Sequence, residues 1–243
     1  MKEALLLSKE DMYFVRTDKD FSTKDGVIKA KELSKKKYGD RIRTHLGKEF
    51  LVAKPTILDI IEKKVKRSAQ VILPKDAGII LAYTGIRPDS LVLDAGTGTG
   101  YLAIFIGNFV SQGKVITYEK DKSFFKIAGE NIKATGLTNI KIKNRDVTKG
   151  IEEKNADLIT LDLQDSDKAI KHAYKALKIG GYLVVYSPTA DHLMKVAKAI
   201  QKQNFNDIKT IENIIREWQT ERTVRPKTMG LMHTGFITFA RKI

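Results

Sequence analysis

The chain has 243 residues, a length that suits one large α/β domain with a small appendage or two compact domains. It carries 44 Lys and Arg against 29 Asp and Glu, a formal net charge of +15, and 42% of its residues are hydrophobic. That much apolar material excludes a disordered basic tail, and the positive excess indicates a polyanionic partner. Because the sequence has no Cys, disulfides, thiolate zinc sites and cysteine nucleophiles are excluded.

Neither a membrane span nor a metal site is expected. The best apolar run, residues 102–110, is interrupted by Gly107 and Asn108 and is shorter than the roughly 18 residues of a span. Near the N-terminus only residues 5–7 form an apolar run, which is too short for a signal-peptide core. The four His are scattered without ligand-like spacing. We therefore expect a cytoplasmic protein without a metal.

The N-terminal third differs from the rest in charge and pattern. Residues 1–75 hold 19 basic and 11 acidic side chains (+8), whereas the other 168 hold 25 and 18 (+7). Short apolar or alternating segments at 12–15, 26–30 and 49–53, separated by turn residues, predict a small antiparallel sheet or barrel. From Pro55 the pattern becomes helical. We expect a small β-domain over residues 1–54, a helical linker over 55–67 and the main domain over 68–243.

The main domain alternates apolar strands with helical patterns. The predicted strands are 91–94, 115–119, 140–146, 158–162 and 182–187. The predicted helices are 101–110, 122–135, 168–177 and 191–203. Strands separated by helices predict a parallel sheet covered on both faces, which binds its ligand at the carboxyl ends of the strands. At the end of the chain, residues 209–221 and 234–241 are predicted as two long paired strands joined across 225–230.

A glycine-rich run, Asp94-Ala95-Gly96-Thr97-Gly98-Thr99-Gly100, follows a predicted strand and opens a helix. Its glycines let the backbone approach a ligand, and the helix N-terminus adds amide donors. The dinucleotide fingerprint G-x-G-x-x-G does not fit, because its third glycine is required at position 101, which is Tyr101. An acid followed by G-x-G-x-G instead resembles motif I of the S-adenosylmethionine (SAM) methyltransferases. An ordinary glycine-rich turn is the structural alternative.

Three further carboxylates end predicted strands. Glu119 is placed where the two ribose hydroxyls of an adenosine would lie, which also fits NAD. Asp146 resembles the methyltransferase acid that accepts from the adenine exocyclic amine. Asp162 ends a buried strand, so we expect its carboxylate to be partly desolvated and to face the substrate. A solvated residue at a strand end is the alternative for each acid taken singly.

The residues after the fourth predicted strand indicate which kind of substrate atom receives the methyl group. Enzymes that methylate exocyclic amines in nucleic acid resemble one another in an Asp/Asn-Pro-Pro-aromatic run at this point. This chain has Asp162-Leu163-Gln164-Asp165 instead. The difference favours a ring atom as the nucleophile.

Three segments resemble one family over nearly the whole chain. Residues 70–76, Gln-Val-Ile-Leu-Pro-Lys-Asp, are similar to the segment before motif I in the archaeal and bacterial single-chain tRNA (adenine-N1)-methyltransferases, which methylate adenine 58 in the T loop. Departures from the family pattern are Leu73, where most members carry Tyr, and Met232, where Gly is usual. The other matching residues are Thr44, His45, Gly47 and residues 50–55 near the N-terminus, and Glu212, Arg216, Trp218, Arg225, Pro226 and residues 233–236 near the C-terminus.

The resemblance implies a fold, a cofactor and a substrate. The fold is a Rossmann-like SAM methyltransferase domain, a mostly parallel seven-stranded sheet with a C-terminal antiparallel hairpin, plus a small N-terminal β-barrel-like domain that helps to hold tRNA. It further implies a homotetramer, Asp162 as the catalytic residue, and methylation of adenine 58, with adenine 57 as a second acceptor in some archaeal members. The implied cofactor-binding residues are Gln70, Asp94, Gly96, Thr97, Gly98, Thr99, Gly100, Tyr101, Leu102, Glu119, Asp146, Val147 and Asp162.

Basic and aromatic residues outside these motifs have two interpretations each. Two basic clusters are expected to track RNA phosphates, with solvated surface lysines as the alternative. His233 is either near the substrate or bound structurally within the hairpin. Tyr83, Tyr186 and Trp218 are expected in the core or an interface, with platforms for base stacking as the alternative. The clusters are Lys31, Lys35, Lys36, Lys37, Arg41 and Arg43, and then Lys63, Lys64, Lys66 and Arg67; Arg216, Arg222 and Arg225 are expected at RNA or a subunit interface.

Two other functions stay open at this point. The same cofactor domain serves protein L-isoaspartyl or small-molecule methylation, although the basic N-terminal domain would then have no purpose. A non-catalytic tRNA-binding subunit is the other alternative. It is disfavoured because the glycine-rich run and the strand-end acids are all intact.

Overall fold

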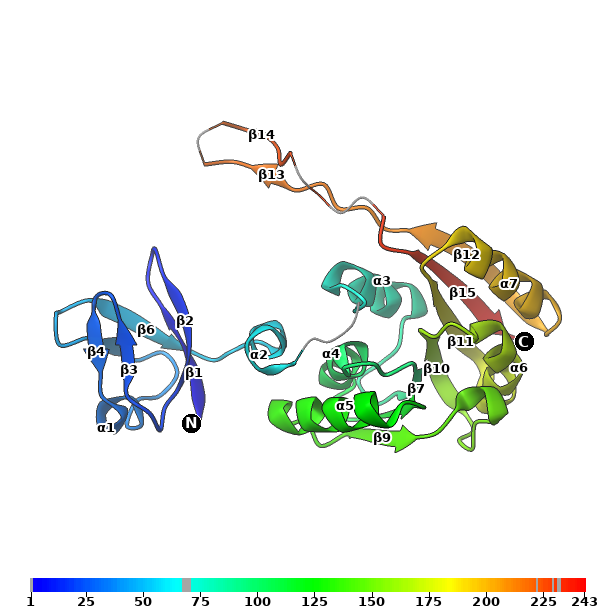
Figure 1. The fold of residues 1–243 in the computed structure, drawn as a ribbon, viewed down its shortest axis with the longest axis horizontal. Coiled ribbons are helices and arrows are strands. Elements are labelled where there is room, and N and C mark those ends of the chain that lie inside the picture. Colours follow the sequence, from blue (N-terminus) through cyan, green and yellow to red (C-terminus); the bar gives the residue numbers. More distant parts are fainter. Residues whose placement is uncertain (1, 67–70, 222, 229, 231–232) are drawn as a thin grey trace. The chain divides into compact units, whose positions relative to one another are not determined.

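The computed structural model describes residues 2–66, 71–221, 223–228, 230 and 233–243. The chain folds as two compact units, Met1–Val65 and Lys66–Ile243, each with its own buried apolar core (Figure 1). Among the helices in these ranges, none combines the length and apolarity that a membrane crossing needs.

The N-terminal unit contains two small antiparallel sheets. Four strands form an antiparallel sheet in the order β2-β1-β6-β5, and β3 and β4 form a separate hairpin. Leu6, Val15 and Phe50 pack in its core. The strands are β1 (Glu3–Leu7), β2 (Met12–Arg16), β3 (Phe21–Thr23), β4 (Gly26–Ile28), β5 (Arg41–Arg43) and β6 (Glu49–Ala53); the helices are α1 (Ala30–Leu33) and α2 (Ile57–Lys64).

The threonine and histidine of the N-terminal motif have structural roles. The Thr44 hydroxyl donates to the Asp25 carbonyl at 2.7 Å, and the Val27 amide donates to Nδ1 of His45 at 2.8 Å. Both bonds tie the turn between β5 and β6 to the β3–β4 hairpin. The motif residues therefore join the two small sheets of this unit.

The C-terminal unit contains a seven-stranded sheet in the order β12-β15-β11-β10-β7-β8-β9. Strands β9, β8, β7, β10 and β11 are parallel, and β15 pairs antiparallel with both β11 and β12. The mostly parallel Rossmann-like sheet with a C-terminal antiparallel pair is thus confirmed. The strands are β7 (Leu91–Ala95), β8 (Lys114–Glu119), β9 (Ile140–Asn144), β10 (Ala156–Leu161), β11 (Leu177–Ser187), β12 (Phe205–Glu212) and β15 (Phe236–Lys242).

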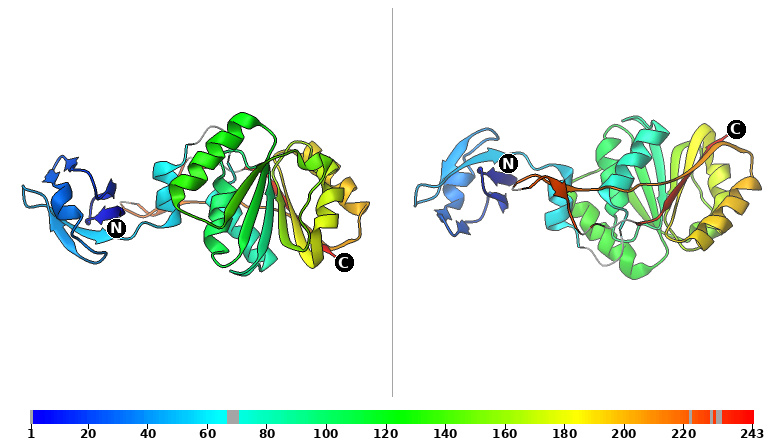
Figure 2. Two further views of the ribbon diagram at one scale, coloured as in Figure 1. Left: turned by 90° about the horizontal axis from the view of Figure 1, so that it is seen from below. Right: turned by 90° about the horizontal axis from the view of Figure 1, so that it is seen from above.

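Helices cover both faces of this sheet (Figure 2). Successive residues of one strand enter opposite cores: Val92 packs with Ile80 and Ile106 on one side, and Leu93 packs with residues of α6 and α7 on the other. Both faces are buried, which explains why the strands are almost continuously apolar. The helices are α3 (Pro74–Thr84), α4 (Tyr101–Phe109), α5 (Lys122–Thr135), α6 (Ser166–Ala176) and α7 (Ala190–Gln201), with a 3-10 turn, η1, at Val147–Lys149.

The prediction of two long C-terminal strands is corrected by the structure. Strand β12 ends at Glu212 and β15 begins at Phe236, and the described residues between them form the short pair β13 (Trp218–Gln219) and β14 (Arg225–Pro226). The ladder stops because Asn213 bonds elsewhere. Its carbonyl accepts from Lys75 Nζ at 2.5 Å, and its side-chain amide donates to the Lys75 carbonyl at 3.0 Å.

Lys75 and Asp76 also explain the run that precedes the glycine loop. Pro74 occupies the first turn of α3, where a missing amide proton costs nothing. Lys75 Nζ lies 2.8 Å from Asp76 Oδ1 and donates to the Thr234 hydroxyl at 2.8 Å, while that hydroxyl donates to Asp76 Oδ2 at 3.1 Å. This buried ion pair therefore fastens the start of α3 to the C-terminal strands.

The close packing of Gly96, in the loop after β7, predicts how a larger residue there would change the free energy of unfolding. Gly96 has φ +85°, and a Cβ there would lie 1.9 Å from the Asp162 carbonyl oxygen. We expect Gly96→Ala to lower the free energy of unfolding by at least about 2 kcal/mol, because backbone must move. The matched control is Gly129→Ala within α5, where a Cβ meets nothing within 4 Å. It should instead raise stability by about 0.5–1 kcal/mol. Thermal and urea unfolding measure both changes, and equal stabilities of the two variants would contradict the packing described.

Candidate active site

A buried carboxylate at the end of β7 joins the three central strands. Asp94 is 1% exposed; its Oδ2 accepts from the Thr117 hydroxyl on β8 and its Oδ1 from the Thr160 hydroxyl on β10, both at 2.6 Å. Thr97 of the glycine loop in turn bonds the Thr117 hydroxyl. Burial raises the pKa of Asp94, and the two hydroxyl donors oppose that rise. Asp94 is thus linked to the glycine loop through the hydroxyls of Thr117 and Thr97.

The glycine loop lies against the end of β10. The Asp162 amide donates to the Ala95 carbonyl at 2.8 Å, and the space where Gly96 would carry a Cβ is filled by Asp162 backbone. Gly96 and Gly98 both have positive φ, +85° and +54°, which glycine adopts without strain. The requirement for glycine at position 96 is therefore a close approach of two backbones.

One pocket collects most of the residues predicted to bind a cofactor. Its lining includes Thr99, whose buried hydroxyl has no hydrogen-bond partner among the described residues, and Gly98, where an added Cβ would lie 4.0 Å from the Gly96 carbonyl oxygen. An unpaired buried hydroxyl beside a glycine fits a polar ligand. The lining residues are Val71, Ile72, Gly96, Thr97, Gly98, Thr99, Tyr101, Leu102 and Asp162; we call this the loop pocket.

Glu119 connects the end of β8 to the glycine loop. Its Oε2 accepts from the Gly98 amide and its Oε1 from the Asp121 amide, both at 2.9 Å. A carboxylate has about four acceptor sites, so each oxygen retains one for a ribose hydroxyl. The side chain is 8% exposed and held in one position.

Asp146 lies after β9 and caps the turn η1. Its Oδ1 accepts from the amide and hydroxyl of Thr148, at 3.0 and 2.7 Å, and this bonding lowers the pKa of Asp146. Asp146 lines a separate hollow with Arg145, Lys149 and Gly150, whereas Val147 is buried in the core. Gly100 caps α4 with its backbone and packs near Ala128. Gln70 lies outside the described residues.

Asp162 lines the loop pocket and also a second pocket, described below. Burial, and then the nearby charge of Asp94, raise the pKa of Asp162 to about 7. Its carboxylate therefore exchanges a proton near neutral pH, as expected for a desolvated acid at the end of a buried strand.

The second pocket that Asp162 lines has a volume of about 360 Å³, within the range of small-molecule sites. Both ring nitrogens of His192 are buried there without a hydrogen-bond partner among the described residues, and burial lowers the pKa of His192. A neutral imidazole can donate with one nitrogen and accept with the other. The lining residues are Asp162, Leu163, Gln164, Tyr186, Pro188, Thr189, Asp191, His192 and Lys195; we call this the acceptor pocket.

Sequence reasoning did not identify His192 or the residues around Pro188 as site residues. A usable signal was present, since Ser187-Pro188-Thr189 ends the strand next to β10 in a parallel sheet. Carboxyl ends of neighbouring parallel strands lie at the same edge. The polar residues after β11 could therefore have been placed beside Asp162.

The aromatic residues and His233 have structural partners. Tyr186 lines the acceptor pocket, and its hydroxyl donates to the Thr234 carbonyl at 2.5 Å. The centroid of the Tyr83 ring lies 5.4 Å from that of Phe239. His233 bonds Glu212 and lies 3.2 Å from the Pro188 carbonyl, and the hydrogen bond to Glu212 raises the pKa of His233. His233 therefore supports the pocket edge from the hairpin.

The predicted basic clusters are partly neutralised. Arg41 and Arg43 both pair with Glu49, Lys64 pairs with Glu3, and Lys66 pairs with Glu130. Within the described part of the chain, Lys31, Lys35, Lys36 and Lys37 around α1 have no ion pair within 4 Å. Arg216 lies over the Trp218 ring, and Trp218 is half exposed. Arg67, Arg222 and Met232 lie outside the described residues.

Comparison with known proteins is consistent with this geometry. Residues 55–232 match the family model described as "tRNA methyltransferase complex GCD14 subunit". The tRNA (adenine(57)-N(1)/adenine(58)-N(1))-methyltransferase TrmI of Methanocaldococcus jannaschii is 36% identical over 91% of this chain and 87% of its own length. The Thermus thermophilus tRNA (adenine(58)-N(1))-methyltransferase TrmI is 31% identical, covering 84% and 81%.

Two solved structures match nearly the whole chain. The Aquifex aeolicus tRNA (m1A58) methyltransferase TrmI has a TM-score of 0.80 and 26% identity, covering 99% of this chain and 96% of its own. A Thermotoga maritima protein described as a SAM-dependent O-methyltransferase has a TM-score of 0.84 and 30% identity, covering 100% and 93%. The chain therefore belongs to the GCD14 family of tRNA methyltransferase subunits.

Proposed function

We propose that the protein transfers a methyl group from SAM to N1 of adenine 58 in the tRNA T loop, with adenine 57 as a candidate second acceptor. The observation that carries this proposal is the position of Asp162. Asp162 lines both the loop pocket and the acceptor pocket. A group transferred between ligands in these two pockets passes beside this residue.

The loop pocket and the carboxylates that follow the neighbouring strands β8 and β9 fit SAM. The glycine loop and the unpaired Thr99 hydroxyl suit the amino acid part, Glu119 suits the ribose hydroxyls, and the second oxygen of Asp146 is available to the adenine amine. Bound SAM supplies an activated methyl group on a positively charged sulfur. We assign Asp94 a positioning role, because both its oxygens bond threonines.

Asp162 has the properties that N1 attack requires. With SAM bound, the lone pair of adenine N1 would take the methyl group from the sulfur, which would keep the electron pair of the broken bond, and the positive charge would pass to the adenine ring. A carboxylate accepting from the N6 amino group stabilises that charge, and with a pKa of about 7 it can accept the amino proton. Partial desolvation strengthens this electrostatic effect, and fixed pockets supply the in-line geometry.

The remaining parts of the chain receive roles in RNA binding and assembly. Adenine inside a T loop must be extruded to reach the acceptor pocket, at a cost of a few kcal/mol. We assign the N-terminal unit to tRNA binding on the basis of the unpaired lysines around α1. We further propose a homotetramer, since Ile214, Ile215 and Trp218 expose about half of their surface between β12 and β15. The site of action is the cytoplasm.

The similar Thermotoga maritima protein is described as an O-methyltransferase, so methylation of a small molecule is the rival function. The basic surface and the family match favour tRNA. The two functions differ in which molecule carries the label after reaction, which one assay can resolve.

The function is tested by incubating the protein with labelled SAM and unmodified tRNA and then digesting the RNA to nucleosides. We expect label in 1-methyladenosine, none from a tRNA in which another base replaces adenine 58 and adenine 57, and a loss of at least about 100-fold in turnover for Asp162→Ala, because general acid–base and electrostatic terms are removed. SAM affinity, measured by calorimetry, should change little. Label in other nucleosides or small molecules alone would contradict the proposal, and normal turnover would remove Asp162 from the mechanism.

The elevated pKa of Asp162 predicts how stability depends on pH. The native state keeps this proton up to about pH 7, while the unfolded state loses it near pH 4. Unfolding between these pH values therefore releases a proton, and the free energy of unfolding falls as the pH rises from about 4 to about 7. Asp162→Asn should therefore be more stable than wild type at pH 8, by at most about 4 kcal/mol, and equally stable near pH 4.

The matched control for that pH prediction is Asp165→Asn, three residues further on. A hydrogen bond from Lys168 lowers the pKa of Asp165, so this change should give no gain in stability at pH 8. Urea unfolding at several pH values measures both variants. Parallel curves for wild type and Asp162→Asn would show that Asp162 is not desolvated.

A third test concerns the ribose site. Glu119→Gln should weaken SAM binding at least about tenfold, because the bonds to the Gly98 amide and the ribose lose their charge-assisted character. The control is Glu130→Gln on α5, whose exposed carboxylate pairs with Lys66. Calorimetry with SAM measures both, and equal affinities in the two variants would show that the ribose site lies elsewhere.

A further inference from the structure

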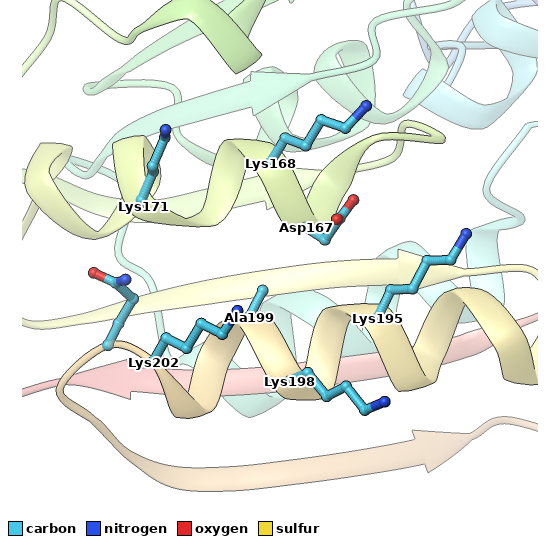
Figure 3. Close-up of a pocket in the computed structure, with 8 residues that line it drawn as sticks. Asp167, Lys168, Lys171, Lys195, Lys198, Ala199 and Lys202 are labelled. Atoms are coloured by element: carbon cyan, nitrogen blue, oxygen red, sulfur yellow. The ribbon is translucent and has the colours of Figure 1, made fainter.

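A lysine-lined groove runs between α6 and α7 on one face of the C-terminal unit. Lys168 and Lys171 come from α6, and Lys195, Lys198 and Lys202 from α7 and its C-cap (Figure 3). All five lysines are exposed. The groove also contains Asp167, so five cations face one carboxylate, and its remaining lining residues are Ala199 and Gln203; we call it the lysine groove.

The groove is positively charged because lysines recur at helical intervals on one side of α7. Lys195, Lys198 and Lys202 are three and four residues apart and therefore share one side of α7, while Val196 and Ile200 face the core. Lys168 pairs with Asp165 at 2.8 Å. In the described ranges, no acid lies within 4 Å of the other four ammonium groups. These cations are therefore available to a ligand.

The groove shares one lining residue with the acceptor pocket. Lys195 lines both, and α7 begins after Ser187 at the carboxyl end of β11. Along α7, Lys195 and Lys202 are separated by about 10 Å of helix axis. The lysine groove thus leads away from the pocket mouth toward the opposite end of the helices.

We propose that the lysine groove binds the sugar–phosphate backbone of the substrate tRNA next to the extruded adenine. This inference rests on the proposed function and adds a second RNA-binding surface, on the catalytic unit itself. A nucleotide turned into the acceptor pocket keeps its two neighbouring phosphates at the pocket mouth, where Lys195 stands. The phosphates that follow meet Lys171, Lys198 and Lys202, and lysines contact phosphate without reading sequence.

The test compares two triple variants with wild type. The first, K171Q/K198Q/K202Q, removes three groove cations and leaves Lys168 and the pocket residue Lys195 in place. The control, K122Q/K126Q/K133Q, removes three exposed lysines from α5 of the same unit, with the same change in charge. Neither set touches the loop pocket, so calorimetry should give unchanged SAM affinity for both.

For the groove variant we expect binding of unmodified tRNA to weaken roughly 10- to 50-fold at 0.15 M salt, and the slope of log affinity against log salt to fall by about 2. KM for tRNA should rise in parallel, with kcat at saturating tRNA unchanged. The control should change far less. Wild-type affinity in the groove variant, or an equal loss in the control, would overturn the inference.

These readouts separate the inference from the proposed function. Wild-type protein that forms 1-methyladenosine, together with a groove variant that binds tRNA normally, defeats the inference alone. Wild-type protein that forms no 1-methyladenosine, together with a groove variant that loses tRNA binding, defeats the proposed function and leaves the groove as an RNA surface.

Discussion

The buried carboxylate of Asp94 is the constraint on which the rest of the catalytic unit depends. Burying a charge without partners is costly, so Asp94 has to be held by hydroxyl donors. Thr117 and Thr160 supply them from the strands on either side, and Thr97 extends the chain of hydroxyls into the glycine loop. The same group that aligns three strand ends therefore also orients the loop. Its charge then reaches Asp162, whose pKa it helps to raise.

Asp162 shows how this arrangement trades stability for chemistry. Its backbone closes the contact with Gly96 and Ala95, and burial raises the pKa of its carboxylate. At neutral pH this desolvation costs folding free energy, because the ionised form is preferred in water. The same desolvation makes the carboxylate a stronger stabiliser of a cation that forms beside it. A site built from an uncompensated acid is thus expected to be a local weak point of the fold.

Sequence reasoning succeeded where one local pattern is enough. Strands β7, β8 and β10 were predicted within two residues at each end, because burial on both faces leaves long apolar runs. Helix α3 was not predicted, since it begins at Pro74 and contains Gly78. The partners of Asp162 were also missed: His192 lies 30 residues away in the chain and reaches the pocket only because β11 neighbours β10. Likewise, Arg41 and Arg43 were counted as cations for RNA, yet both pair with Glu49 on the neighbouring strand.

That last difference changes how the +15 charge should be interpreted. A count along the chain finds the highest basic density in the first 75 residues, where much of it is cancelled by acids across strands or close in space. The lysines of α6 and α7 are spaced at helical intervals with apolar residues between them, so a linear count dilutes them. In the folded protein, acids neutralise much of the N-terminal charge, whereas the packing of α6 against α7 brings five lysines together along one groove. Charge that acts on a polyanion is set by what remains unpaired on one surface, and that quantity depends on tertiary structure.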